Sequence, residues 1–104
     1  GVQQMVAAVP GLEREGARLV QACCRTMTRC AQDKMIQVFL ASLEMHTALL
    51  ALPLQQMCSR SELHTNFTPL LQAWRAKLAD SNHRVRDAAE GALLAVCRHP
   101  AFGP

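Results

Sequence analysis

The stretch Asp80-Ser81-Asn82-His83-Arg84-Val85-Arg86-Asp87-Ala88-Ala89 holds a turn, a helix start and an alternation of acidic and basic residues within ten positions. Asp, Ser and Asn favour a turn because their short side chains hydrogen-bond nearby backbone groups, and the same chemistry caps a following helix. Small apolar residues then recur at helical spacing, at Val85, Ala88, Ala89, Ala92 and Val96. The stretch therefore predicts a short loop followed by a helix that faces a core.

The composition also favours helices. The chain has 104 residues and half of them are apolar, but only 4% are aromatic and Tyr is absent. Strands favour β-branched and aromatic residues, and no window of this sequence alternates with a period of two. The length suits one small domain or two to three helical repeats. We therefore expect a single all-α domain, or a fragment of one, over residues 1–104.

Apolar periodicity and turn residues predict four helices, at about residues 12–30, 34–52, 69–78 and 83–97. Residues 1–9 would end an earlier helix, which Pro10-Gly11 would break. Asp33 is the expected N-cap of the second helix, and Thr68-Pro69 the expected start of the third. Residues 54–67 would then form a connector, either irregular throughout or with a short turn of helix. The order gives two helical hairpins, at about 12–52 and 68–99.

Charge and cysteine content bear on the partners and the compartment. The formal net charge is +3 and no basic run reaches five residues, so nucleic acid is not an expected partner. A mildly basic surface suits an acidic protein partner equally well. The five cysteines form no C-x-x-C pair, which favours a reducing compartment. Since no signal peptide or membrane-length apolar run is visible, we expect a cytoplasmic protein without a membrane partner.

Residues 80–89 resemble the second half of a HEAT repeat, a helical hairpin that stacks with its neighbours. In that family a turn Asp lies six residues before an Arg at the start of the second helix, which is the spacing of Asp80 and Arg86. The first hairpin keeps the Asp as Asp33, 47 residues before Asp80, with Phe39 in the place of the Arg. The resemblance implies a short HEAT-like α-solenoid in which Asp80 and Arg86 form a structural ion pair across the turn.

The segment Asp33–Leu50 also resembles helices of TOG-type HEAT domains. Such domains bind tubulin in microtubule regulators, and similar folds occur in ciliary-tip proteins and in a mitogen-activated kinase kinase kinase. In that family the turns within the hairpins touch tubulin. The resemblance therefore implies an interaction module that binds tubulin, at the cytoskeleton, centrosome or cilium. The partner-binding positions that it implies here are Gln32, Lys34, Ser81, Asn82, His83 and Arg84.

Other functions stay open beside this one. The predicted helix over residues 34–52 is apolar on several sides, which also suits a scaffold or regulatory domain that binds another protein or itself. No nucleophile–base motif, Gly-rich phosphate loop or carboxylate pair occurs, so neither an enzyme nor a cofactor or metal site is expected. Trp74 is expected in the core, with an interface anchor as the alternative. His46 is expected to be a hydrogen-bonded histidine of the core or of a groove.

Overall fold

The computed structural model describes residues 9–102, and all regular elements in that range are helices. The prediction of an all-α fold is confirmed. The helix end expected at residues 1–9 falls almost wholly outside the described residues. The elements are α2 (Val9–Ala31), α3 (Ile36–Leu50), α4 (Leu54–Met57), α5 (Arg60–Lys77), α6 (His83–Arg98) and the 3-10 helix η1 (Pro100–Phe102).

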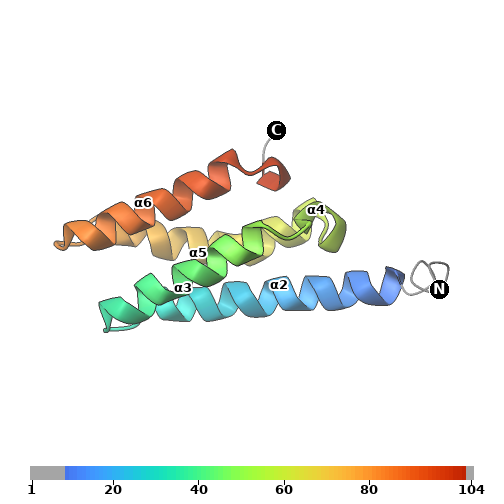
Figure 1. Ribbon diagram of the computed structural model, residues 1–104, viewed down its shortest axis with the longest axis horizontal. Helices are drawn as coiled ribbons and strands as arrows, with labels where there is room; N and C mark the ends of the chain where they lie inside the picture. Colours follow the sequence, from blue (N-terminus) through green and yellow to red (C-terminus); the bar gives the residue numbers. More distant parts are fainter. Residues whose placement is uncertain (1–8, 103–104) are drawn as a thin grey trace.

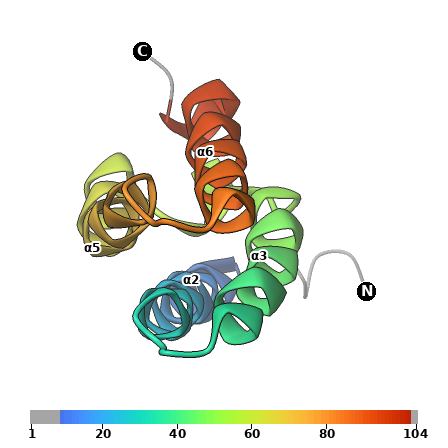
Figure 2. The same cartoon turned by 90° about the vertical axis from the view of Figure 1, so that its left-hand side faces the viewer.

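Two antiparallel helix pairs, α2–α3 and α5–α6, make up the described part of the chain (Figure 1). Seen end-on, α2 and α5 lie on one side, and α3 and α6 lie on the other (Figure 2). α2 packs against both α3 and α5, while α6 packs against both α5 and α3. The short helix α4 joins the pairs at the end opposite the two tight turns. The arrangement is that of two stacked hairpins, and its assignment to the HEAT family stays a prediction.

The starts of α2 and α3 differ from those predicted. The break expected at Pro10-Gly11 is wrong, because both residues lie within α2. Pro10 is tolerated in the first turn, where a backbone N–H has no partner within the helix. The N-cap expected at Asp33 is also wrong, because α3 begins at Ile36 and its cap residue is Met35. Asp33 instead accepts a hydrogen bond from Met35 N–H at its Oδ1, at 2.8 Å, within the turn.

α5 begins nine residues before the predicted start at Pro69, so the connector expected at 54–67 is wrong from Arg60 onward, whereas the short turn of helix expected within it is present as α4. A capping box fixes this start: Ser59 Oγ accepts from Glu62 N–H at 3.1 Å, and Ser59 N–H donates to Glu62 Oε1 at 2.8 Å. Leu63 and Phe67 then enter the core. Pro69 lies inside the helix, which continues to Lys77. Burial of the segment thus outweighs the helix-breaking tendency of the proline.

α6 agrees with its prediction to within one residue at each end. It begins at His83, and its N-cap Asn82 accepts from Arg84 N–H at Oδ1, at 2.9 Å. The helix buries one stripe, formed by Val85, Ala89, Ala92 and Val96. The turn and helix are specified locally, because the capping residue and the apolar spacing lie within one short stretch.

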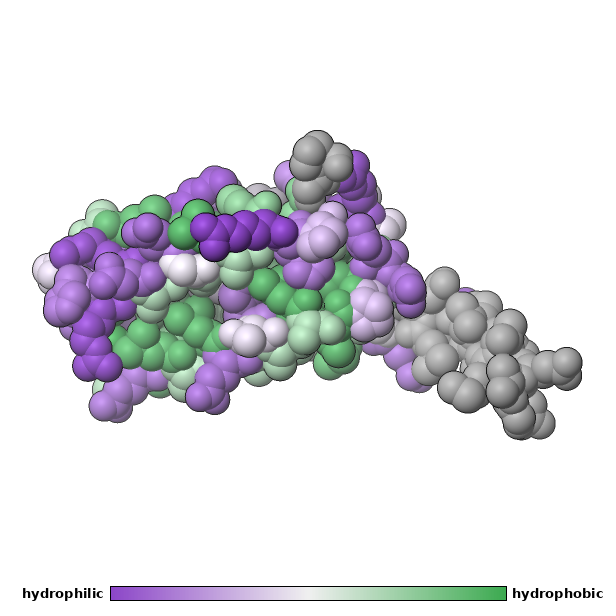
Figure 3. Space-filling model, turned by 45° about the horizontal axis from the view of Figure 1, so that its top comes forward, coloured by the Kyte–Doolittle hydropathy of each residue, from purple (hydrophilic) through white to green (hydrophobic). Residues whose placement is uncertain are grey.

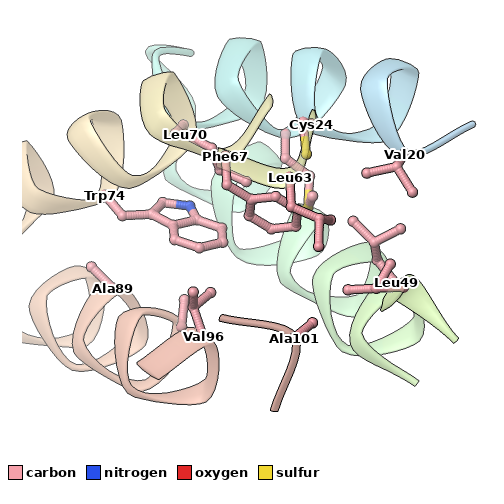
Figure 4. Packing of buried hydrophobic residues seen from close by; sticks show 14 of the residues in the cluster. Val20, Cys24, Leu49, Leu63, Phe67, Leu70, Trp74, Ala89, Val96 and Ala101 are labelled. Atoms are coloured by element: carbon pink, nitrogen blue, oxygen red, sulfur yellow. The ribbon is translucent and has the colours of Figure 1, made fainter. Parts of the chain in front are cut away.

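The core lies between the two helix pairs, and Trp74 is at its centre. Figure 4 shows the indole of Trp74 extending from α5 toward Ala89 and Val96 of α6. Trp74 has no exposed surface, and Phe39 and Phe67 are buried as fully. The prediction that Trp74 is a core residue is confirmed. Burial of each large side chain of this kind stabilises the folded state by about 2 kcal/mol, because its apolar surface is removed from water.

Candidate protein-interaction surface

The two tight turns lie at the same end of the molecule, at the left in Figure 1 and nearest the viewer in Figure 2. We call this surface the turn end. It consists of residues 32–35, between α2 and α3, and residues 78–84, from the end of α5 to the start of α6. All six predicted partner-binding residues belong to it. The fold therefore brings together two groups of residues that are far apart in the sequence.

The first turn is held by backbone bonds and by Asp33. Gln32 N–H donates to the carbonyls of Thr28 and Arg29, at 3.2 and 3.1 Å, and closes α2. The Asp33 carboxylate bonds to Met35 N–H, as described above. The side chains of Gln32 and Lys34 are exposed. One acidic side chain thus fixes the turn, while its two neighbours face solvent.

The second turn is held by Asp80, Asn82 and Arg86. Asp80 Oδ1 accepts from Asn82 N–H at 2.8 Å, and the Asn82 amide caps α6. Arg86 Nη1 donates to the carbonyl oxygens of Asp80 and Ser81, at 2.7 and 3.1 Å. These bonds satisfy backbone groups that neither helix can pair.

The link between Asp80 and Arg86 therefore takes a different form from the predicted ion pair. The guanidinium bonds to the backbone carbonyl of Asp80, and the carboxylate of Asp80 bonds to the backbone N–H of Asn82. Both side chains act on the backbone of the turn. A spacing of six residues predicts that the two residues are near one another, but it does not specify which of their atoms meet.

Most of the predicted partner-binding residues present their side chains to solvent. The exposed ones are Gln32, Lys34, Ser81, His83 and Arg84. Asn82 is half-buried, and its side chain is engaged as the cap of α6. Asn82 therefore shapes the second turn, and the other five residues are the ones that a partner can reach.

Two apolar residues of the turn end were not among the predicted site residues. Met35 is 58% exposed and Leu78 is 42% exposed. The sequence pattern assigned both to the apolar sides of their helices, because each fits helical spacing. The sequence signal that could have identified Met35 and Leu78 as site residues is their position next to the predicted turns. The turn end thus combines cationic and apolar side chains, and both Met and Arg are enriched in protein interfaces.

A cation–π contact joins two helices next to the turn end. Lys77 Nζ lies 5.5 Å from the centroid of the Phe39 ring, which is buried between the helices. The contact joins the end of α5 to α3, because Lys77 and Phe39 belong to these two helices. Lys77 itself is half-buried.

The cysteines do not form a comparable site. Burial raises the pKa of Cys24 to about 12, with smaller contributions from Cys23 and Cys58, and burial also raises the pKa of both of these thiols. Such thiols stay protonated and weakly nucleophilic at neutral pH. Within residues 9–102, no three His, Cys, Asp or Glu side chains are grouped so as to hold a metal ion. In the same range, no helix has the length and apolarity needed to cross a membrane.

Comparisons with known proteins give one similarity. Human mitogen-activated protein kinase kinase kinase 1 is 27% identical to this chain over 84 residues. The matched region covers 80% of this chain and 6% of the kinase. No family model and no solved structure matches the chain. Since the chain spans so small a part of the kinase, the similarity concerns one segment of that protein.

Proposed function

We propose that the chain is a non-catalytic protein-interaction module of HEAT type, and that its turn end binds the partner. The observation that carries the proposal is that both tight turns lie side by side and expose Lys34 and Arg84 together with Met35 and Leu78. Side chains of the turns themselves, Asp33 among them, hold the backbone rigid. A rigid surface of cations and apolar side chains suits an acidic protein surface with apolar contacts.

Tubulin is the partner that we propose first. The support comes from the resemblance of Asp33–Leu50 to TOG-type helices, together with the position of both turns at one end. The resemblance described above includes a TOG-like fold in a mitogen-activated kinase kinase kinase, and the chain is similar over 84 residues to human mitogen-activated protein kinase kinase kinase 1. On this proposal the protein works in the cytoplasm, at the cytoskeleton or at the centrosome or cilium.

Size-exclusion chromatography with αβ-tubulin tests this proposal. At roughly 50 μM of each protein, a complex with a low-micromolar Kd co-elutes. We expect co-elution for the wild type and its loss for the double variant Lys34→Ala/Arg84→Ala. The matched control is Arg14→Ala/Arg18→Ala, which removes the same charge from exposed positions of α2 far from the turns. If the wild type gives no complex at this concentration, the tubulin proposal is wrong.

Self-association, or a scaffold role with another protein, is the second candidate. Several large apolar side chains are exposed outside the turns, including Leu19 at 49% and Leu94 at 41%. Figure 3 shows hydrophobic patches between the polar side chains on one face. Light scattering tests this candidate. A dimer that dissociates on Leu19→Glu or Leu94→Glu supports self-association, and a monomer at high concentration contradicts it.

A further inference from the structure

Four arginines form a line along the outer face of α2. They are Arg14, Arg18, Arg25 and Arg29, and all four are exposed. Their spacings of four, seven and four residues place them within about 60° of one another around the helix, because each residue advances by about 100°. The line is about 22 Å long, from the rise per residue of the helix. We call these four residues the arginine stripe.

A groove lies beside Arg14 and Arg18, the first two residues of the arginine stripe, between α2 and the α4–α5 segment. It consists of two adjoining depressions of about 530 and 390 Å³, which share Arg14, Ala17 and Glu62. Arg18 and Gln21 line the second depression from α2, and Ser61, Thr65 and Asn66 line it from α5. At the other end, Met57 of α4 sits against Gly16, where an added Cβ would be 3.1 Å from Met57 Cβ. The absence of a side chain at Gly16 thus lets α4 form the end of the groove.

The groove offers many hydrogen-bond donors and little negative charge. Glu62 is the only acidic residue among those that line the two depressions, and its Oε1 is engaged by Ser59 N–H. Within residues 9–102, the side chains of the arginine stripe form no hydrogen bond or ion pair. Guanidinium groups without an intramolecular partner favour carboxylates as ligands, because they can bind a carboxylate through two parallel hydrogen bonds.

We infer that the arginine stripe and its groove bind an acidic α-helix of a protein partner. A helix with carboxylates at positions i, i+4, i+11 and i+15 has the same rise as α2, so it aligns all four carboxylates with the four arginines. Binding a helix in a groove between two helices is a common mode of peptide recognition. Nucleic acid fits less well, since no aromatic side chain lines the groove for base stacking and the net charge is only +3. The groove with Arg14 and Arg18 lies at the other end of α2 from the turn end, so the inference does not depend on the proposed function.

Fluorescence anisotropy with designed peptides tests the inference on the full chain. The first probe is a fluorescein-labelled, alanine-rich helical peptide with Glu at i, i+4, i+11 and i+15. The second has the same composition, with its Glu residues distributed around the helix. We expect the first peptide to bind roughly tenfold more tightly at low salt, and Arg14→Gln/Arg18→Gln to remove most of that difference. The variant Lys34→Gln/Arg84→Gln loses the same charge at the turn end and should bind the first peptide as the wild type does.

Three results would overturn the inference. They are equal affinity for the two peptides, equal affinity of the wild type and Arg14→Gln/Arg18→Gln for the first peptide, or tighter binding to a 20-base-pair DNA duplex than to that peptide. Circular dichroism of each variant shows that it is folded. Tubulin co-elution is measured on the same variants and responds to the turn-end substitutions only, so the two proposals succeed or fail separately.

Discussion

Two polar aromatic rings meet in the core, those of His46 and Trp74. Their ring centroids are 4.5 Å apart and the ring planes meet at 68°, an edge-on contact. His46 Nε2 lies 3.2 Å from the carbonyl oxygen of Ala92, so this nitrogen carries the proton when the ring is neutral. His46 Nδ1 and Trp74 Nε1 are buried without a hydrogen-bond partner. The prediction of a hydrogen-bonded core histidine is confirmed, and the pair joins α3, α5 and α6.

Acidification should destabilise the protein through His46. Burial lowers the pKa of His46, the hydrogen bond to Ala92 opposes this, and nearby His99 adds to the lowering. A histidine whose pKa is lower when folded binds its proton more readily when unfolded, so its contribution to stability is complete above the unfolded pKa of about 6.5 and is lost as the pH falls below that value. The slope from one group is at most about 1.4 kcal/mol per pH unit.

Urea titrations at pH 7.5 and pH 5.5 measure this dependence. His46→Gln keeps a hydrogen-bond donor but does not titrate, so the free energy of unfolding should fall less between the two pH values than in the wild type. His83→Gln is the matched control, because His83 is exposed at the first position of α6. If the free energy of unfolding falls by the same amount in His46→Gln as in the wild type, other groups cause the pH dependence.

At the scale of the element, α5 depends on its first turn. The capping box of Ser59 and Glu62 satisfies backbone and side-chain groups at the start of the helix, and Pro69 removes one backbone donor from its interior. Thr68 Oγ1 donates to the carbonyl of His64 at 2.6 Å, one turn back. The helix therefore begins where its cap is strong and passes through its proline because Phe67 and Leu70 on either side are buried.

Removing the cap should cost measurable stability. We expect Ser59→Ala to lower the free energy of unfolding by about 1 kcal/mol, the usual effect of losing a serine N-cap. Urea denaturation followed by far-ultraviolet circular dichroism measures it. Ser61→Ala makes the same chemical change at an exposed position inside α5 and should change stability by less than about 0.5 kcal/mol. Equal effects of the two substitutions would contradict the role of the cap.

The sequence predicted elements well where the determining residues are adjacent. α6 was placed correctly because Asn82 and the stripe from Val85 to Val96 lie in one short stretch. The start of α5 was predicted in the wrong place, because Thr68-Pro69 has the residue types of a helix start. Only the burial of Leu63 and Phe67 shows that the helix begins earlier. At the turn end, the sequence identified the turn residues, but exposure of Met35 and Leu78 follows from packing between distant segments.

At the scale of the whole molecule, polar and aromatic contacts bind the two helix pairs to each other. His46 of α3 bonds to Ala92 of α6, and His99 Nε2 bonds to the carbonyl of Leu50 at 2.8 Å. Phe67 and Phe102 contact each other with centroids 4.7 Å apart, which fixes η1 on α5. Because the shared core lies between the pairs, neither pair has a complete core of its own.

The two pairs should therefore unfold together. Trp74 is the single tryptophan and lies between the pairs, so its fluorescence reports their separation, while circular dichroism reports all helices. In urea, we expect both signals to give the same midpoint and the same m-value, within a single transition. A fluorescence transition at lower urea than the loss of helix would mean that the pairs separate first.

The hydrogen bonds of the second turn and the start of α6 divide the residues there into two groups. Asp80, Asn82 and Arg86 direct their side chains to the backbone, whereas Ser81, His83 and Arg84 face outward. Substitutions in the outward group should therefore cost little folding stability, whereas substitutions in the first group remove hydrogen bonds of the turn. Different residues at Ser81, His83 and Arg84 would thus give the turn end a different outer surface and leave the turn itself intact.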